Sequence, residues 1–202
     1  MDYGMGNVRS VYNALDALGQ DAVVTADPKE IANSDRVILP GVGAFGDAMD
    51  NLRQRGLIEV LSREVLQEKK PFLGICLGMQ LLAMSSTEHG EHPGLGWFDA
   101  SVVRFGLPKN GYKVPHMGWN DITPRLDHPL LRGLKEGQFV FYFVHSFHVT
   151  CRNPADVAAS CDYGYPFTAA VARDNIFATQ FHPEKSQDNG LQVLRNFAEW
   201  RP

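Results

Sequence analysis

The sequence predicts an α/β fold in which a mostly parallel central sheet is flanked by helices and carries an antiparallel extension. Short apolar runs alternate with stretches of helical periodicity through the first half of the chain, which is typical of parallel strands covered on both faces. The second half is richer in extended aromatic segments and tight turns, which favours antiparallel pairing. The length of 202 residues suits one domain over residues 1–202.

In the first half, predicted helices and strands follow one another. Val8, Val11 and Leu15 recur at helical spacing, and Gly19 follows as a C-terminal cap. Helices are therefore expected over residues 8–18, 47–55 and 57–68, with another from Leu77, and strands at residues 22–24, 37–39 and 72–75.

The second half is less regular. Its Gly and Pro residues predict a loop at residues 86–96 and an irregular segment at residues 109–120. Aromatic and β-branched residues predict extended segments at residues 102–105 and 138–149. Residues 171–173 and 176–181 are expected to form a hairpin around Asp174-Asn175, and a closing helix is expected at residues 191–197.

Charge and composition exclude several classes of function. Lys and Arg total 19 against 23 Asp and Glu, so the net charge is −4 and the basic surplus of a nucleic-acid-binding protein is missing. No apolar run approaches the roughly 20 residues of a membrane span, and the first residues show no signal-peptide pattern. Three irregularly spaced cysteines argue against a disulfide framework and a structural zinc site, and favour a cytoplasmic location.

The sharpest chemical feature is Cys76, which lies between Gly74 and Gly78 where a buried strand turns into a helix. A nucleophile at such a turn is exposed at the strand end, and glycines on both sides avoid clashes. Free amides at the helix start favour the thiolate. The alternative is a buried structural cysteine, because free cysteine is often buried.

His182 and Glu184 favour the functional interpretation of Cys76. They follow the predicted strand at residues 176–181, so both side chains lie at a strand end. An imidazole can accept the thiol proton, and a carboxylate can orient its other ring nitrogen. The three residues form a coherent Cys–His–Glu triad, although a His and a Glu on a surface loop would show the same short pattern.

The turn Gly41-Val42-Gly43 ends another strand and can present backbone amides to a developing oxyanion. The amide of Leu77, directly after the nucleophile, is the second expected donor. Without the cysteine, the same glycines would indicate a simple strand-to-helix turn.

The remaining histidines are weaker candidates for a functional site. His145 and His148 share one predicted strand three residues apart, so they are expected to face opposite sides and to be structural or interfacial. His89 and His92 lie in a polar loop without matching distal ligands, so no metal site and no cofactor is expected.

Six blocks of sequence resemble one family. DYGMGN at 2–7, LPGVGAFGDAM at 39–49, KPFLGICLGMQLL at 70–82, KVPHMGWN at 113–120, FYFVHSFH at 141–148 and QFHPEKS at 180–186 resemble class I (triad-type) glutamine amidotransferases, whose fold is flavodoxin-like. PHMGWN and YFVHS narrow the resemblance to the glutaminase subunits of imidazole glycerol phosphate synthase. Members begin with apolar residues before DYG, so the first strand is expected to be shortened here.

The resemblance implies a mechanism and a set of site residues. Cys76 would attack the side-chain amide of L-glutamine, with His182 as base and acid and Glu184 orienting it. Glutamate would leave by hydrolysis of a thioester, and the ammonia would pass to a (β/α)8-barrel cyclase subunit that makes imidazole glycerol phosphate and aminoimidazole carboxamide ribotide. The remaining implied contacts are Gln80, Ser146 and Phe147 with glutamine, and Asn7, Trp119, Tyr142 and Lys185 with the partner.

Three alternatives remain beside this interpretation. The same chemistry could serve another acceptor, as in a pyridoxal phosphate, GMP or anthranilate synthase, and the PHMGWN and YFVHS blocks argue against it. A cysteine peptidase or related hydrolase on a similar turn would cleave peptides without a partner. A catalytically dead binding module would need a broken triad, whereas all three triad residues are present.

Overall fold

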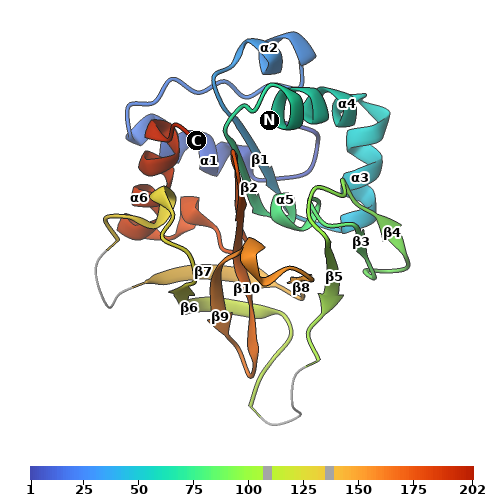
Figure 1. Ribbon diagram of the computed structural model, residues 1–202, viewed down its shortest axis with the longest axis vertical. Coiled ribbons are helices and arrows are strands. Elements are labelled where there is room, and N and C mark those ends of the chain that lie inside the picture. The colour runs from blue at the N-terminus through green and yellow to red at the C-terminus, as the bar shows by residue number, and fades with distance from the viewer. Residues whose placement is uncertain (107–110, 135–138) are drawn as a thin grey trace.

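A curled sheet of mixed direction forms the centre of the protein (Figure 1). The computed structural model describes residues 1–106, 111–134 and 139–202. Within them the sheet has seven strands in the order β1-β2-β11-β10-β9-β6-β7. The parallel part comprises β1 (Val37–Gly41), β2 (Phe72–Cys76) and β11 (Ile176–Thr179). The antiparallel part comprises β10 (Pro166–Arg173), β9 (Val157–Asp162), β6 (His116–Pro124) and β7 (Val140–His145).

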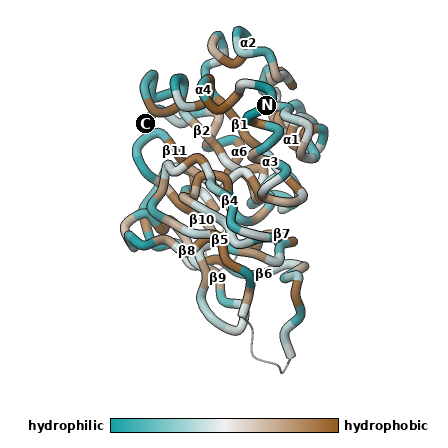
Figure 2. Tube along the Cα trace, turned by 90° about the vertical axis from the view of Figure 1, so that its right-hand side faces the viewer, coloured by the Kyte–Doolittle hydropathy of each residue, from teal (hydrophilic) through white to brown (hydrophobic). Residues whose placement is uncertain are grey.

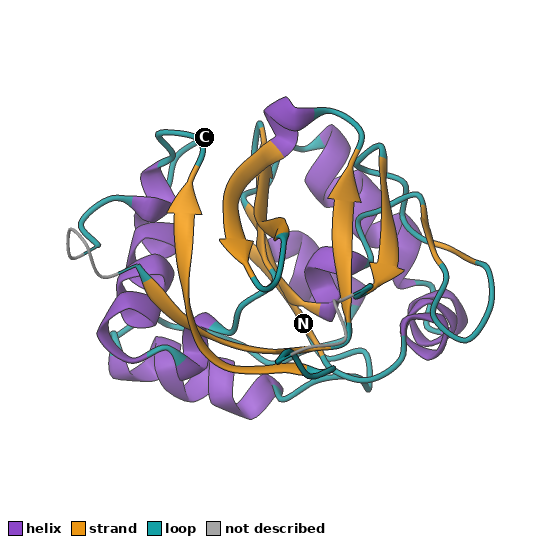
Figure 3. Cartoon of the chain, turned by 90° about the horizontal axis from the view of Figure 1, so that it is seen from below, coloured by secondary structure: helices purple, strands orange, loops and turns teal. Residues whose placement is uncertain are grey.

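A second, smaller sheet lies beside the first and follows the order β4-β3-β5-β8 within the described residues. Its long strands are β5 (Ala100–Arg104) and β8 (Phe147–Cys151), and its short ones are β3 (Ser85–Ser86) and β4 (His92–Pro93). Only Ser146 separates β7 from β8, so the chain passes from one sheet to the other at that residue. Figure 3 shows the strands bending through the middle of the molecule with helices along the outside.

Helices cover both faces of the parallel strands. In Figure 1, α1 (Val8–Ala17) and α6 (Gln187–Glu199) lie on one side, and α3 (Phe45–Gln54) and α4 (Leu57–Leu61) on the other. The remaining helical segments are α2 (Pro28–Asn33), α5 (Leu77–Gln80), a π-helical continuation of α4 termed η1 (Ser62–Gln67), and the 3-10 turns η2 (Pro129–Leu131), η3 (Pro154–Asp156) and η4 (Pro183–Lys185).

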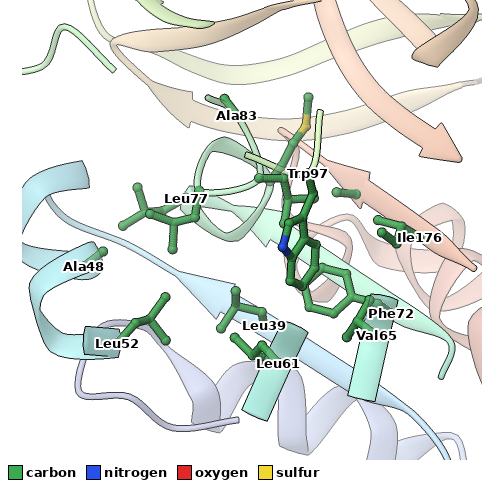
Figure 4. Packing of buried hydrophobic residues seen from close by; sticks show 14 of the residues in the cluster. Leu39, Ala48, Leu52, Leu61, Val65, Phe72, Leu77, Ala83, Trp97 and Ile176 are labelled. Atoms are coloured by element: carbon green, nitrogen blue, oxygen red, sulfur yellow. The ribbon is translucent and has the colours of Figure 1, made fainter. Parts of the chain in front are cut away.

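Alternate residues of the parallel strands feed two separate hydrophobic clusters. Phe72 of β2 packs toward α3 and α4, whereas its neighbour Leu73 packs toward α1 and α6. Figure 2 shows apolar stretches along these central strands. In the first cluster Phe72 meets Trp97 edge to face at 5.2 Å between ring centroids (Figure 4). Each fully buried side chain of this size contributes about 1.5–3 kcal/mol.

The start of α5 packs directly on β1, and this contact fixes the position of the β2–α5 junction. A Cβ atom at Gly78 would lie 1.8 Å from the backbone oxygen of Leu39. Only glycine fits at such a distance, so α5 can lie across the strand ends immediately after Cys76. Cys76, the last residue of β2, is held at the carboxyl end of the parallel strands as a result.

Most predicted elements are confirmed. The α/β class, the parallel core, the antiparallel extension and the helices over residues 8–18, 47–55 and 191–197 all appear, with boundaries shifted by a few residues. The hairpin turn around Asp174 is present, with a positive φ of 51° at that residue. The antiparallel part is larger than a mostly parallel sheet implies, because four of the six strand pairs in the described seven-stranded sheet are antiparallel.

Residues 22–24 are not a strand, contrary to the sequence prediction. They lie beyond the edge strand β1, and the first residues of the chain lie between the two segments. The Met1 amino group donates to the Ile38 oxygen at 2.9 Å, and the Asp2 amide donates to the Thr25 oxygen at 2.7 Å. A groove of about 590 Å³ runs beside this contact and is lined mainly by residues 20–25 and 33–38.

Three further predictions were wrong in part. The segment 109–120 is not irregular throughout, because β6 begins at His116 and pairs with β7 and β9. The single extended segment 138–149 is two strands, divided at Ser146. The helix predicted from Leu77 ends at Gln80. Lys109 and Gln138, where two of the predicted segments begin, lie outside the described residues. None of the described helices is long and apolar enough to cross a membrane.

Gly78→Ala should destabilise the protein by about 3 kcal/mol, because its methyl group would overlap the Leu39 carbonyl and force α5 away from β1. Urea unfolding measures the change. Gly106→Ala is the matched control, since a Cβ atom there meets nothing within 4 Å, and it should stay within about 0.5 kcal/mol of the parent. Equal stability of the two variants would contradict the proposed close contact.

Candidate active site

Cys76 occupies a strained turn between β2 and α5. It is 7% exposed, and its φ of 54° and ψ of −108° lie in a region that side chains rarely adopt. Such a conformation costs about 1–3 kcal/mol and persists only where the surroundings enforce it. A Cβ at Gly74 would lie 2.9 Å from the Gly78 oxygen, so the backbone before and after the turn is packed too closely for larger residues.

His182 and Glu184 lie together at the start of η4. The His182 Nδ1 atom is 2.8 Å from Glu184 Oε1, and both side chains are 2% exposed. Because the carboxylate can only accept, Nδ1 carries the proton and donates to it. The backbone amide of His182 donates to the Tyr142 oxygen at 3.0 Å, which ties the imidazole to β7. Nε2 is then the ring nitrogen available to the thiol.

The electrostatics couple His182 to Cys76. Burial by itself lowers the pKa of His182, but the charge of Cys76 and the charge and hydrogen bond of the Glu184 carboxylate outweigh burial and raise the pKa well above its usual value. The protonated imidazolium form of His182 is therefore favoured beside Cys76. The structure brings together the three residues of the predicted triad.

The unsatisfied buried side-chain atoms gather at this site. In the described part of the chain they are the Tyr3 hydroxyl, His182 Nε2 and Glu184 Oε2. Tyr3 is fully buried beside Gly41, and burial together with the Cys76 charge raises its pKa, so the hydroxyl keeps its proton. Buried polar atoms are normally paired, and exceptions cluster where a ligand or a reacting group supplies the missing partner.

Two of the predicted oxyanion residues, Gly41 and Leu77, lie directly beside Cys76. Gly41 is the direct register partner of Cys76 across the β1–β2 pair. Gly43 has a φ of 104°, which suits glycine, and Val42 between them is 40% exposed. Leu77 is buried and begins α5. The turn therefore follows the strand residue paired with Cys76, and α5 begins directly after Cys76.

Two of the three predicted glutamine-contacting residues are in direct contact. The Gln80 side-chain amide donates to the Phe147 oxygen at 3.0 Å and is itself 5% exposed. Ser146 is the half-buried link between β7 and β8. These residues form one wall of the site, supplied by α5 and by the crossing between the two sheets.

Gln180 was missed from the sequence. Its Nε2 atom donates to the Cys76 sulfur at 3.6 Å, its Oε1 atom accepts from Gln80 Nε2 at 3.0 Å, and its side chain is fully buried. A weak signal was present, because Gln180 is a polar residue at the end of a buried strand, two positions before His182.

Three of the four predicted interface residues lie together. The rings of Trp119 and Tyr142 are 5.9 Å apart, and the Lys185 ammonium lies 5.9 Å from the centre of the Tyr142 ring. Trp119 is 49% exposed. Asn7 instead lies at the start of α1, where its side chain accepts from the Ser10 amide and caps the helix. Helix α1 packs against η4, which carries Lys185.

His145 and His148 do not face opposite sides, contrary to the prediction. Both contact the ring of Phe105, at 5.1 and 4.7 Å between centroids. The strand is broken at Ser146, so the alternation of sides does not continue from one histidine to the other. The predicted structural role is consistent with the burial of both side chains, which are 6% exposed each.

The two other cysteines and the polar loop have ordinary roles. Burial raises the pKa of Cys151 to about 11 and that of Cys161 to about 12, so both are thiols at neutral pH. Glu88, beside His89, accepts from the Phe45 amide at 2.8 Å and caps α3. Among the residues that the structure describes, no group of three His, Cys, Asp or Glu side chains is arranged to hold a metal ion.

The glutamine amidotransferase class-I family model matches residues 1–200 of this chain. The chain belongs to the class I glutamine amidotransferase family. It is 52% identical to the imidazole glycerol phosphate synthase subunit HisH 2 of Nitrobacter winogradskyi over 100% of this chain and 97% of the relative. It is also 52% identical to subunit HisH of Sulfurimonas denitrificans, with the same coverage of each chain. The class I glutamine amidotransferase assignment makes this chain an enzyme.

Solved structures share the fold of this class I glutamine amidotransferase. A crystal structure of a putative GMP synthase subunit from Thermoplasma acidophilum has a TM-score of 0.70 and 24% identity, over 98% of this chain and 90% of the other. A second glutamine amidotransferase structure has a TM-score of 0.69 and 23% identity, over 96% and 94%. At these identities the likeness establishes the common fold.

Iodoacetamide at pH 7 should modify Cys76 ahead of Cys151 and Cys161. The pKa of Cys151 near 11 leaves about one thiolate in ten thousand at this pH, whereas Cys76 is paired with an imidazolium. Peptide mapping by mass spectrometry identifies the modified residue, and Cys76→Ser provides the background rate. Equal modification of all three cysteines would show that Cys76 is not activated.

Acid should destabilise the fold through its buried neutral histidines. Burial lowers the pKa values of His116 and His128 to about 4 and that of His145 to about 3. Between pH 6.5 and 4 the unfolded chain therefore binds protons that the folded chain does not, and the free energy of unfolding falls as the pH falls. The slope is at most about 1.4 kcal/mol per pH unit for each histidine.

The variant His128→Asn tests this slope, because asparagine keeps an acceptor for the Leu130 amide but does not titrate. Urea unfolding between pH 6.5 and 4.5 should give a smaller slope for the variant than for the parent. An identical slope would mean that His128 is not held neutral in the folded state.

Proposed function

We propose that this chain is the glutaminase subunit of imidazole glycerol phosphate synthase. It hydrolyses L-glutamine to glutamate and ammonia with Cys76 as nucleophile, His182 as base and acid, and Glu184 as the residue that orients the imidazole. The observation that carries the proposal is the coupled Cys76, His182 and Glu184 group in a chain about half identical, over its full length, to subunits of that synthase.

The proposed reaction begins with attack of the Cys76 thiolate on the side-chain amide carbon of glutamine. The amides of the Gly41–Gly43 turn and of Leu77 hold the oxyanion of the tetrahedral intermediate. His182, already an imidazolium, gives its proton to the leaving ammonia, and a glutamyl thioester remains on Cys76. Water activated by the now neutral His182 hydrolyses the thioester and releases glutamate.

Gln80, Ser146 and Phe147 are proposed to contact the bound glutamine. The Gln80–Phe147 hydrogen bond supports this placement, because it joins the wall of the site to the α5 segment that begins at the nucleophile. A substrate lying along this wall would have its side-chain amide at Cys76. Dry surroundings at these buried residues would limit loss of the reacting ammonia to bulk water.

The proposed partner is a (β/α)8-barrel cyclase subunit that accepts the ammonia and makes imidazole glycerol phosphate and aminoimidazole carboxamide ribotide. Trp119, Tyr142 and Lys185 form the proposed docking surface, with Asn7 at the adjacent start of α1. The exposed Met117 and Trp119 lie on the same side of β6 and support a protein contact there. A heterodimer in the cytoplasm is the proposed assembly.

A different acceptor within the same family is the second candidate, since the Thermoplasma acidophilum structure shares the fold. Copurification separates the two. A tagged form of this chain should retain the barrel cyclase of its own organism, and glutamate release should rise when the cyclase and its nucleotide substrate are added. Retention of a GMP-forming synthetase instead would replace the proposed acceptor, and peptide hydrolysis without a partner would point to a peptidase.

Cys76→Ala should abolish glutamine-dependent synthesis by the complex, with a loss of at least about a thousandfold, because no other thiol at the site can form the thioester. Synthesis from added ammonia should remain, since the cyclase does not use Cys76. Cys151→Ala is the control and should keep both activities. Equal loss of both activities in Cys76→Ala would contradict the proposed separation of the two reactions.

A further inference from the structure

A continuous chain of hydrogen bonds runs from Asn120 and His116, on the side of β6 opposite Met117 and Trp119, to the Cys76 sulfur. Asn120 Nδ2 lies 3.3 Å from His116 Nε2, and His116 Nδ1 lies 3.1 Å from His145 Nε2. His145 Nδ1 lies 2.8 Å from the Phe147 oxygen. That oxygen also accepts from Gln80, which donates to Gln180, which donates to Cys76.

The donor and the acceptor of each hydrogen bond in this network follow from the Phe147 oxygen, which can only accept. The Phe147 oxygen can only accept, so His145 carries its proton on Nδ1 and its Nε2 is an acceptor. His116 must then donate from Nδ1, which leaves its Nε2 to accept from Asn120. Both rings are neutral at pH 7, because burial lowers the pKa of His116 to about 4 and that of His145 to about 3.

The same logic fixes the orientation of the two glutamine side chains. Gln80 faces the Phe147 oxygen, so it must present its NH₂ group there and toward Gln180 Oε1. Gln180 then has its oxygen occupied and presents its own NH₂ group to the sulfur. A reversed Gln180 would direct an oxygen at a thiolate, which both the charge and the Gln80 donor oppose.

The outer end of this hydrogen-bond chain, at Asn120 and His116, lies next to the proposed docking surface. His116 and Asn120 flank Met117 and Trp119 on β6, and the latter two are 64% and 49% exposed. Along a strand, 116 and 120 face one side and 117 and 119 the other. A partner that contacts Met117 and Trp119 therefore contacts the same strand that carries the first two members of the hydrogen-bond chain.

We propose that Gln180 is a further catalytic residue that stabilises the Cys76 thiolate, and that His116 and His145 are positioning residues which transmit contact at Met117 and Trp119 to it through Phe147 and Gln80. This regulatory role rests on the proposed function. Reacting groups that depend on a buried polar network respond to shifts along it, because each hydrogen bond fixes the orientation of the next donor.

The first test is Gln180→Met, which keeps the volume of the buried side chain and removes its donor. The pH midpoint of Cys76 alkylation by iodoacetamide should rise by about one unit, and kcat for glutamine hydrolysis in the cyclase complex should fall about 10- to 100-fold. The titratable groups that act on Cys76 are His182 from η4, with Glu184 behind it, and Tyr3, and none of them changes in the variant. A folded Gln180→Met protein with unchanged midpoint and kcat would overturn the assignment.

The second test compares His145→Phe with His148→Phe. Both histidines are 6% exposed and both rings contact Phe105, but His148 bonds to the Tyr165 hydroxyl and lies outside the chain of donors. His145→Phe should reduce the stimulation of glutamine hydrolysis by the partner at least fivefold, and His148→Phe should not. His145→Asn should restore it, because the asparagine NH₂ group can replace Nδ1 as donor to the Phe147 oxygen.

Equal effects of His145→Phe and His148→Phe, with no rescue by His145→Asn, would overturn the positioning role. This comparison also carries the test if Gln180→Met does not fold. Alkylation reports on Cys76 in the chain alone, so it separates the two claims. If the wild-type complex failed to hydrolyse glutamine while the alkylation midpoint still moved in Gln180→Met, the proposed function would fail and the role of Gln180 at the sulfur would stand.

Discussion

The close packing of β1, β2 and α5 is the constraint on which the site depends. Gly78 lies against the Leu39 carbonyl, and Gly41 lies beside the Tyr3 hydroxyl and the Leu77 side chain. With no room for the chain to relax, Cys76 is held at a positive φ and its sulfur stays at the strand ends. That conformation costs about 1–3 kcal/mol, and the two hydrophobic clusters on either face of the sheet offset the cost.

The charged groups around Cys76 then determine the chemistry that its sulfur can perform. Glu184 fixes the tautomer and orientation of His182, and Cys76 and the Glu184 carboxylate together raise the pKa of that ring despite its burial. The neighbouring histidines are neutral for the opposite reason, since burial lowers their pKa values and no carboxylate opposes it. Imidazoles in one small region therefore serve as an acid near the sulfur and as neutral hydrogen-bond relays further out.

Local patterns in the sequence predicted what depends on local chemistry. A few neighbouring residues were enough to recognise three features. These are the glycines around Cys76, the His182 and Glu184 pair after a strand, and the turn at Gly41–Gly43. What depends on tertiary packing was not predicted. Ser146 breaks one apolar run into strands of two different sheets, which brings His145 and His148 to one cluster. Residues 22–24 have strand propensity but no strand pairing, and Gln180 acquires its role only through partners a hundred residues away.

The central claim is that His182 is an imidazolium because a thiolate lies beside it. Nitrogen-15 NMR of histidine-labelled protein at pH 7.5 tests it directly, since charged and neutral rings give distinct nitrogen shifts. Both ring nitrogens of His182 should be protonated in the wild-type chain, and Cys76→Ser should lower the pH at which the ring loses its proton. A neutral His182 ring at pH 7.5 in the wild-type chain, with a titration unchanged in Cys76→Ser, would contradict the account.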